Sequence, residues 1–270
     1  MDLFKYPRTR HVEGSRLQPG DIADNKQLRD LAGQFLTVEE KLDGANSALS
    51  FDRDGNLLLQ SRGHYLTGGW RERHFALFKT WAASHAQTFH AVLGHRFVMF
   101  GEWMFAKHTV FYDRLPHYFM EFDLLDRDSG LFLSTAARRE ILCGLPVMPV
   151  PVLFQGTIGS VDDLRALIAP SLYKSSNWRA ALTIAAEASG SRPEMVARQT
   201  EDSDLAEGLY LKLEVGVQVQ DRFKFVRADF HQAIQAADGH WLDRPILPNG
   251  LDDGIDIFAP RLGRPGAYDV

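Results

Sequence analysis

The sequence predicts an α+β fold in which antiparallel sheets are flanked by helices. Short runs of alternating or wholly apolar residues, bounded by turn residues, occur in both halves of the chain, and segments with helical apolar spacing lie between them. Of the 270 residues, 45% are hydrophobic, so the chain can bury a substantial core. We expect a single domain over residues 1–270, with a helical insertion at about 134–204 and a short C-terminal extension at 228–270.

The first predicted strands flank an Asp-Gly pair. "FLTVEEK" precedes Asp43-Gly44, and "NSALSF" follows it. The stretch from Asp52 to Asn56 is rich in turn residues, and "LLLQS" then returns. This pattern predicts a β-hairpin, with Lys41 placed where the sheet begins.

A helix and two buried strands are predicted next. From Trp70 to His90 apolar residues recur at helical spacing, which predicts one amphipathic helix. "FVMFGEW" and "HYFMEFDLLD" then have the composition of buried strands. In the second strand, alternation places Met120, Phe122 and Leu124 on one face and the two acidic residues between them on the other.

Residues 134–204 carry the signals of helices. Ser160 is a suitable N-cap for "VDDLRALI", and the helix predicted at "NWRAALTIAAEASG" stops at Gly190. The strand pattern resumes at "EGLYLKLEVGVQVQDRFKFVR". We therefore expect a helical block that interrupts the sheet.

Composition narrows the possible classes of protein. With 30 Lys and Arg against 35 Asp and Glu, the formal charge of −5 is not that of a protein that coats nucleic acid non-specifically. The single cysteine excludes an intramolecular disulfide and zinc sites built on cysteine. No apolar run approaches the roughly 20 residues that span a bilayer, and the N-terminus lacks the apolar core of a signal peptide. We expect a cytoplasmic protein without membrane contact.

Candidate catalytic residues come from two distant parts of the chain. Alternation places Arg222 and Lys224 on one face of the last strand, and Lys212 and Glu214 on one face of an earlier strand. If these strands lie beside Lys41, their cations and carboxylates converge on one concave sheet. A solvated outer face would give the same alternation, and a Lys-x-Asp-Gly match alone is an ordinary turn signal.

Six short motifs carry a resemblance to a known superfamily. In order they are "EKLDGAN" (40–46), "SRG" (61–63), "FGEW" (100–103), "EFDLLD" (121–126), "EGLYLK" (207–212) and "RFK" (222–224). Together they resemble motifs I, Ia, III, IIIa, IV and V of the covalent nucleotidyltransferases, and most closely those of the ATP-dependent RNA ligase branch. The resemblance implies an ATP-grasp-like nucleotidyltransferase domain that uses ATP and Mg²⁺, or Mn²⁺ in its place.

The resemblance also implies a role for each motif residue. Lys41 would attack the α-phosphate of ATP, pass AMP to a 5′-phosphate end and so allow a 3′-hydroxyl to seal the strand. Lys212 and Lys224 would be catalytic cations, and Glu207 and Asp43 would hold the metal. The residues implied to bind the nucleotide are Glu40, Asn46, Arg62, Glu102, Phe122, Glu207 and Arg222.

Three of these roles have plainer alternatives. Phe122 would stack on adenine, but a strand aromatic is as often part of the core. Arg62 would contact a phosphate, or be a surface residue. Glu102 would bond a ribose hydroxyl, or be the partner of a nearby lysine.

The proposed nucleophile must lose a proton before it can attack. A free lysine has a pKa of about 10.4 and is protonated at neutral pH. Burial and the cations Lys212 and Lys224 would both disfavour the ammonium form. We therefore predict that the pKa of Lys41 is lowered.

Differences from the family pattern bear on the branch. Asn46 stands where DNA ligases place Arg, which favours RNA as the substrate. Arg222 stands where motif V usually has a lysine, and a register that used Lys224 and Val226 would lose one cation. Only 43 residues follow Arg227, too few for the C-terminal OB domain of DNA ligases and capping enzymes, so we expect none.

The alternatives to an RNA ligase are a minimal DNA ligase, a non-sealing module that binds nucleotides or strand ends, and an enzyme that passes AMP to another acceptor. Without an OB domain, RNA or nicked duplex ends must be held by a local basic surface or by a protein partner. The candidate basic contacts are Arg8, Arg10, His11, Arg71, Arg73, His74, Lys107 and His108.

Overall fold

The computed structural model describes residues 3–17, 21, 25–230 and 246–260. Its strands are β1 (Arg10–Val12), β2 (Asn25–Lys26), β3 (Leu36–Lys41), β4 (Ala45–Phe51), β5 (Leu57–Ser61), β6 (His64–Tyr65), β7 (Phe97–Trp103), β8 (Phe119–Asp126), β9 (Leu131–Leu133), β10 (Met148–Pro149), β11 (Val152–Gly156), β12 (Gly208–Val215) and β13 (Gln218–Val226). The 3₁₀ helices are η1 (Leu28–Leu31) and η2 (Trp70–Phe75). The α-helices are α1 (Ala76–Ser84), α2 (Ala86–Leu93), α3 (Thr135–Leu142), α4 (Val161–Ala166), α5 (Trp178–Ala188) and α6 (Pro193–Arg198).

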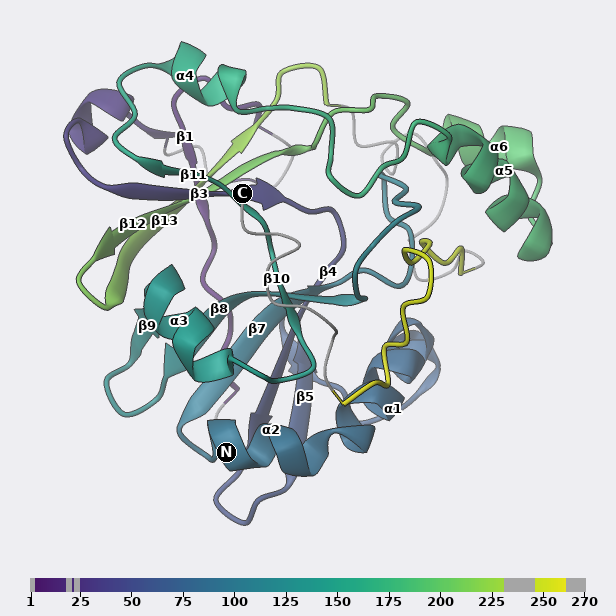
Figure 1. Cartoon of the computed structure of the whole chain (residues 1–270), viewed down its shortest axis with the longest axis horizontal. Helices are drawn as coiled ribbons and strands as arrows, with labels where there is room; N and C mark the ends of the chain where they lie inside the picture. The colour runs from purple at the N-terminus through teal and green to yellow at the C-terminus, as the bar shows by residue number, and fades with distance from the viewer. Residues whose placement is uncertain (1–2, 18–20, 22–24, 231–245, 261–270) are drawn as a thin grey trace.

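These strands form one sheet with two halves. The order is β11-β3-β12-β13-β9-β8-β7-β4-β5-β6, with β1, β2 and β10 attached outside this path. In Figure 1 the half that contains β3, β11, β12 and β13 lies above the half that contains β4, β5, β7 and β8. Pairing along the path is antiparallel, and β1 and β10 pair in parallel. The predicted α+β class with antiparallel sheet is confirmed.

Each half of the sheet has its own apolar core. Against the lower half, α1 and α2 bury Phe78, Trp81 and Phe89, which pack with Trp103 and Phe119. The upper half buries alternate apolar residues of β3, β12 and β13 together with α4. Burial of one face of each strand therefore sets the register and aims the opposite residues away from these cores.

The predicted hairpin and the predicted single helix differ in outcome. The hairpin is confirmed as β4 and β5, and the side chain of Asp52 accepts the backbone N–H groups of Asp54 and Asn56 in its turn. The single helix predicted from Trp70 to His90 is wrong. The chain forms η2, α1 and α2, with non-helical geometry at His85 (φ −108°, ψ 10°).

The predicted helical insertion is only partly helical. It contains α3 to α6, and Ser160 caps α4 through a capping box with Asp163. However, β10 and β11 also fall within it, and β11 pairs with β3 at Val152 and Glu39. The strand signal was missed because prolines and a glycine surround this short apolar run. No helix in the described part of the chain is long and apolar enough to cross a membrane.

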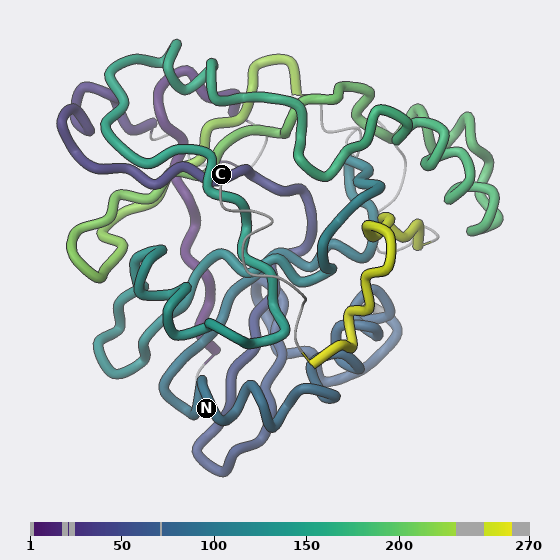
Figure 2. The backbone as a smooth tube through the Cα atoms, in the orientation of Figure 1, coloured from purple at the N-terminus to yellow at the C-terminus, as the bar shows by residue number. Residues whose placement is uncertain are grey.

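Residues 3–12, here named the N-terminal strap, run across both halves of the sheet (Figure 2). The carbonyl of Phe4 accepts a hydrogen bond from Gln60 of β5. The hydroxyl of Tyr6 donates to Asp123 of β8 at 2.5 Å. The end of the strap, β1, then pairs with β13. The strap therefore ties the two halves together.

The described part of the predicted C-terminal extension packs on the core. Asn249 is 2% exposed, and its side-chain oxygen accepts from the N–H of Tyr112 at 3.0 Å. Its side-chain nitrogen donates to the carbonyl of Met104 at 2.6 Å. Residues 231–245 and 261–270 of the predicted extension lie outside the described residues.

Five buried residues form a charge network that joins both halves of the sheet to α3. Arg138 of α3 lies 2.9 Å from Glu39 of β3 and 3.4 Å from Glu121 of β8. Lys212 of β12 lies 2.9 Å from Glu39 and 3.1 Å from Asp123 of β8. All five side chains are at most 2% exposed. Because water is excluded, each charge depends on its partners, and we name this set the buried charge network.

The substitution Arg138→Met should lower the free energy of unfolding by about 3–5 kcal/mol, because it leaves Glu39 and Glu121 buried without this partner. Urea denaturation followed by circular dichroism measures the change. Arg165→Met is the matched control, since Arg165 is 61% exposed and pairs with Asp162 at the surface, where a pair contributes about 1 kcal/mol or less. A loss for Arg138→Met no larger than the control's would contradict a stabilising network.

Candidate active site

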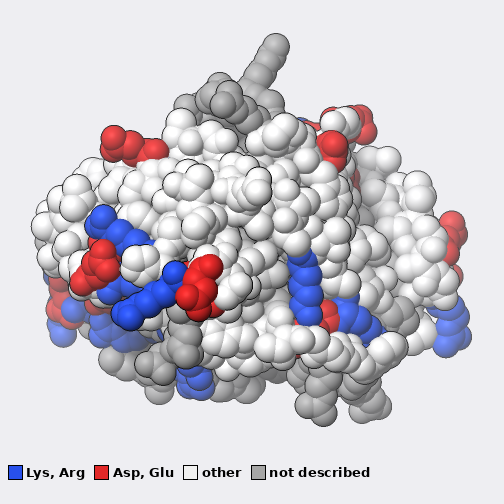
Figure 3. Space-filling view, turned by 90° about the horizontal axis from the view of Figure 1, so that it is seen from below, with Lys and Arg blue, Asp and Glu red and all other residues white. Residues whose placement is uncertain are grey.

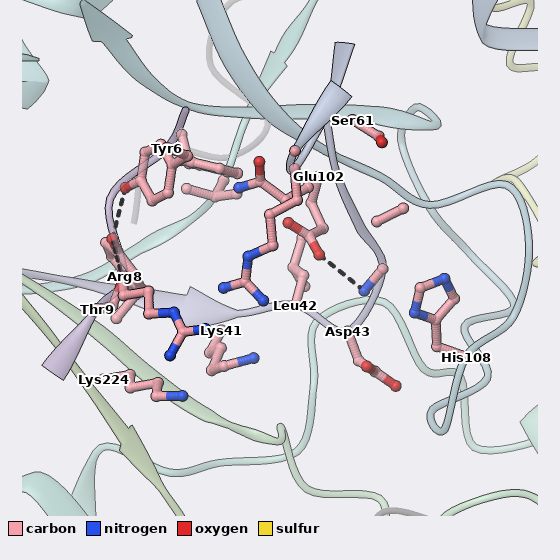
Figure 4. Close-up of a pocket in the computed structure, with 18 of the residues that line it drawn as sticks. Tyr6, Arg8, Thr9, Lys41, Leu42, Asp43, Ser61, Glu102, His108 and Lys224 are labelled. Atoms are coloured by element: carbon pink, nitrogen blue, oxygen red, sulfur yellow. Dashed lines mark hydrogen bonds between the residues drawn. The ribbon is translucent and has the colours of Figure 1, made fainter. Parts of the chain in front are cut away.

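A cleft of about 1360 Å³ is lined by residues from both halves of the sheet and from the N-terminal strap. Lys41, Glu102 and Lys224 lie around it in the close-up, with Arg8 and Thr9 of the strap on one side (Figure 4). The predicted site residues that line it are Glu40, Lys41, Asp43, Asn46, Arg62, Glu102, Phe122, Glu207 and Lys224. Lys212 and Arg222 are the two predicted site residues outside this lining.

The amine of Lys41 lies among carboxylates. Lys41 is the last residue of β3 and pairs with Gly208, so the register places it beside Glu207 at the start of β12. Its Nζ donates to Oε2 of Glu207 at 2.7 Å. Asp43 and Glu102 also attract the ammonium group.

The pKa of Lys41 is raised, so the prediction that it is lowered is wrong. Burial lowers the pKa, but the attraction and hydrogen bond of Glu207, followed by Asp43 and Glu102, raise it by more. Lys212 pairs with Thr37, four residues along the strand from Gly208, or roughly 13 Å at 3.3 Å per residue. The prediction was based on the cations that share a strand face. The sequence does not show which carboxylates the fold brings closer to Lys41 than those cations.

Two of these carboxyl groups have strongly raised pKa values. Burial raises the pKa of Glu207 to about 7, and Lys41 opposes this shift. Burial also raises the pKa of Glu102 to about 7, although the positive charge of Lys41 lowers it. The negative charge of Asp43 raises both. The cleft therefore holds more acidic groups than Lys41 neutralises.

Gly44 is needed because β4 passes close to β7. A Cβ atom at position 44 would lie 2.9 Å from Cγ of Glu102. With no side chain in the way, the N–H of Gly44 donates to Oε1 of Glu102 at 3.2 Å. Oδ2 of Asp43 accepts the N–H groups of Thr109 at 2.7 Å and Val110 at 2.8 Å. The Asp-Gly pair thus fixes two carboxylates of the cleft.

The donor set fits a divalent cation. Asp43, Glu102 and Glu207 offer carboxylate oxygens, which Mg²⁺ and Mn²⁺ prefer, and the excess negative charge at this site would be offset by such an ion. Within the described residues, no group of three or more His, Cys, Asp or Glu side chains is arranged to hold a metal. The protein would therefore supply part of the coordination, with phosphate and water oxygens as the remaining ligands.

Phe122 owes its position to a β-bulge. Phe100 pairs with Asp123 and Gly101 with Glu121, so Phe122 is the extra residue of β8 and is left without a partner on β7. It does not share the full burial of Met120 and Leu124 but remains partly exposed in the cleft, 5.3 Å from the ring centre of Tyr6.

The other predicted nucleotide contacts differ in exposure. Asn46 of β4 pairs with Glu102 of β7, and Arg62 is exposed directly after β5. The carboxylate of Glu40 is instead engaged by the insertion. It accepts hydrogen bonds from the hydroxyl of Ser171 at 2.5 Å and from the N–H of Leu172 at 3.4 Å.

Lys212 and Arg222 support the cleft instead of lining it. Lys212 belongs to the buried charge network and also donates to the carbonyl of Phe122. Arg222 lies over the ring of Phe132 at 3.9 Å, and its Nε is 3.5 Å from Asp123. Strand alternation predicts which face of the sheet a side chain lies on. It does not predict where along the strand the other half of the sheet covers that face.

Lys224 remains in the cleft, with partners that the motifs do not contain. Its Nζ donates to Oδ1 of Asp21 at 2.6 Å. Oδ2 of Asp21 lies 2.9 Å from Nε2 of His11. The segment that precedes the first motif therefore supplies the contacts of the second cleft lysine.

Several cleft residues were missed by the sequence analysis. They are Lys5, Tyr6, Thr9, Asp21, His64, Trp70 and Glu72. Those in the first 21 residues lie outside every motif, and no spacing pattern links them to Lys41. The sequence contained one indication for Trp70. It is followed by four polar residues at the start of the helix pattern, so it has no apolar neighbours to pack with and is expected to be exposed.

The predicted basic contacts do not form one surface. Arg8 and His108 line the cleft. The other members whose side chains are described, Arg10, His11, Arg73, His74 and Lys107, each contact other groups of the protein. The side chain of Arg71 lies outside the described part. On the face shown in Figure 3, Lys and Arg side chains lie in small groups beside Asp and Glu.

Comparisons with known proteins cover most of the chain. The RNA ligase family model matches residues 34–226. No curated protein matches the sequence. Similar solved structures include a Naegleria gruberi RNA ligase mutant with ATP and Mn, at 18% identity and a TM-score of 0.48 over 82% of this chain and 60% of that chain.

Two further structures of this Naegleria gruberi RNA ligase are similar. A mutant with AMP and Mn matches at 16% identity and a TM-score of 0.49, over 83% of this chain and 62% of that chain. The ligase with PPi matches at 18% identity and a TM-score of 0.48, over 83% and 61%. The chain thus spans about three fifths of the length of the solved chains it matches.

The family match extends over well more than half of the 270 residues and contains Lys41, Glu102, Glu207 and Lys224. The cleft described above is built largely from this segment. The chain therefore belongs to the RNA ligase family.

Proposed function

We propose that the chain is an ATP-dependent RNA ligase that joins 5′-phosphate and 3′-hydroxyl ends through a lysyl-AMP intermediate on Lys41. The observation that carries this proposal is the position of the Lys41 amine. It lies in a large cleft within the family-matched segment, 2.7 Å from a carboxylate and with Lys224 in the same lining. This arrangement supplies a nucleophile, a proton acceptor and a cation for phosphate.

The first step begins with attack by Nζ of Lys41 on the α-phosphorus of ATP. An N–P bond forms, the bond from the α-phosphorus to the bridging oxygen breaks, and pyrophosphate leaves with the electron pair. Oε2 of Glu207 is within hydrogen-bond reach of Nζ and is positioned to accept its proton. An oxygen of the 5′-phosphate then attacks the α-phosphorus, the N–P bond breaks and the amine of Lys41 is released. Finally the 3′-hydroxyl oxygen loses its proton and bonds to the 5′-phosphorus, and AMP leaves with the electron pair of the broken phosphorus–oxygen bond.

Other residues bind and orient the reactants. Asp43 and Glu207 would hold Mg²⁺ or Mn²⁺. The positive charge of the ion would offset the carboxylates that raise the pKa of Lys41, and so lower that pKa. Lys224 and Arg62 offer preorganised positive charge to phosphate oxygens. Glu102 would accept a hydrogen bond from the ribose, and the exposed part of Phe122 would stack on adenine.

Glu40 supports the wall of the cleft rather than the nucleotide. Burial raises the pKa of its carboxyl group to about 7, although Ser171, Leu172 and Lys174 oppose the shift. The folded state therefore favours the protonated form, while the unfolded state releases the proton near pH 4.3. The stability that this proton provides is present at low pH and is lost as the pH rises through about 7.

Lys41→Ala should abolish the covalent AMP adduct, because it removes the amine that forms the N–P bond. Incubation with radiolabelled ATP and Mg²⁺, followed by a denaturing gel and intact mass, measures the adduct. Lys26→Ala is the matched control, since Lys26 lies on β2 outside the cleft lining, and it should label as the wild type does. Wild-type labelling of Lys41→Ala would refute the assignment.

Matched nicked duplexes, with RNA or DNA on the 3′-hydroxyl side, extend this experiment to the substrate. Faster sealing of the RNA nick supports the proposal. Equal sealing of an all-DNA nick would identify a minimal DNA ligase, and an adduct without sealing of any nick would identify a non-sealing module.

Lys224→Met and Lys212→Met should fail in different ways, although both lysines belong to the family motifs. Lys224→Met should reduce the rate of adduct formation by roughly 100-fold with little loss of stability, because it removes a cation from the cleft. Lys212→Met should lower the free energy of unfolding by about 3–5 kcal/mol, since it breaks the buried charge network. Single-turnover labelling and urea denaturation separate the two effects. If Lys212→Met instead slowed adduct formation with little loss of stability, Lys212 would be a catalytic residue.

Glu40→Gln should change the dependence of stability on pH. The amide keeps the shape of the side chain but has no proton to lose. Relative to the wild type, the variant should gain about 3 kcal/mol of unfolding free energy as the pH rises from about 4.5 to above 7. Urea denaturation across this range measures the difference, with Glu140→Gln on the exposed side of α3 as the control. A difference that does not vary with pH would show that Glu40 is ionised in the folded state.

A further inference from the structure

Trp70 is an exposed aromatic residue in the lining of the cleft. It is 74% exposed, whereas Trp81, Trp103 and Trp178 are at most 2% exposed. It belongs to the same cleft lining as Lys41 and Arg62. Since a tryptophan in water exposes a large apolar area, its place in an active-site cleft requires an explanation.

The surroundings of Trp70 hold it in place without covering it. The guanidinium of Arg73 lies 4.5 Å from the ring centre, a cation–π contact. The preceding loop is fixed by Glu72, whose carboxylate accepts the N–H groups of Thr67 at 3.1 Å and Gly68 at 2.8 Å and pairs with Lys79. The ring is therefore positioned by its neighbours, and most of its surface remains open.

Cations accompany this aromatic surface. Lys5 and Arg8 of the N-terminal strap and Arg62 after β5 are exposed and line the same cleft. An open aromatic ring together with cations is the chemistry that binds single-stranded nucleic acid, because bases stack on the ring while phosphates contact the positive charges. Phe122 occupies a different environment on β8, where it packs with Tyr6 and Tyr210.

We propose that Trp70 is a stacking platform for one nucleobase of the RNA strand whose end enters the cleft. The identity of this substrate rests on the proposed function. Trp70 binds and positions the strand and takes no part in bond making. Because every base has a flat face, the contact holds the strand without reading its sequence.

Binding can be measured separately from ligation. The probe is a 5′-phosphorylated oligoribonucleotide with fluorescein at its 3′ end, which blocks sealing, and fluorescence anisotropy reports its Kd. Trp70→Ala should weaken binding about 5- to 100-fold, and Trp70→Phe, which keeps an aromatic face, should stay within about 3-fold of the wild type. Phe35→Ala is the control, because Phe35 is 49% exposed but lies outside the cleft lining. Its Kd should not change.

Two further measurements identify the contact as stacking. Trp70→Ala should leave the slope of log Kd against log salt unchanged, whereas Arg62→Ala should reduce its magnitude by about 1 through loss of a phosphate contact. Oligomers that lack the base at one position at a time should locate the stacked nucleotide. At that position, the losses of binding free energy caused by removing the base and by removing the indole should not be additive, because each change removes the same contact.

The outcomes distinguish this proposal from the proposed function. Weaker RNA binding by Trp70→Ala, with a wild-type rate of AMP adduct formation, supports the platform. Unchanged RNA binding, or no binding even by the wild type, overturns it. A raised KM for ATP in adduct formation, with unchanged RNA binding, overturns it in favour of a ring that holds the nucleotide. Absence of the adduct in the wild type rejects the ligase assignment, while the Kd values still decide whether Trp70 stacks on RNA.

Discussion

The structure depends on the buried charge network, because it joins the strands that form the cleft. Glu39 lies between Arg138 of α3 and Lys212 of β12, and Asp123 and Glu121 of β8 complete the set. Neither half of the sheet can shift relative to the other without leaving a charge buried and unpaired, which is costly in an interior of low dielectric. Glu39 is two residues before Lys41 on β3. The network that holds the fold together therefore also fixes where the candidate nucleophile lies.

Charge balance governs the cleft itself. The carboxylates of Asp43, Glu102 and Glu207 surround one amine, so the pKa of Lys41 rises while burial raises the pKa of two of the acids to about 7. The proposed attack by Lys41 therefore requires that positive charge enters the cleft or that a carboxylate takes its proton. In this arrangement reactivity would depend on the bound metal and nucleotide, and the amine would remain protonated until they arrive.

The family-matched segment does not build the whole cleft. The N-terminal strap precedes residue 34, yet it supplies Lys5, Tyr6, Arg8 and Thr9 to the lining, and Asp21 holds Lys224. The strap also contacts β5, β8 and β13. It therefore has a double role: it bridges the two halves of the sheet and adds the cations Lys5 and Arg8 to the cleft that contains Lys41. Together with Trp70 of the same lining, these residues form the surface on which the proposed RNA strand would lie.

The sequence by itself determined the α+β class, the hairpin of β4 and β5 and the capped helix α4, because these depend on local periodicity and on local turn and cap signals, and its short ordered motifs named part of the cleft lining. The motifs named Lys41, Asp43, Glu102, Glu207 and Lys224, and the structure brings all five into one cleft lining, whereas their roles stay predictions. Tertiary structure alone decided that Lys212 is buried in the charge network, that the partly buried Arg222 packs on Phe132 outside the cleft lining, that β11 extends the sheet, and that Lys41 has a raised pKa. Alternation along a strand gives the face of a side chain, whereas burial and charge depend on which distant strands pack against that face.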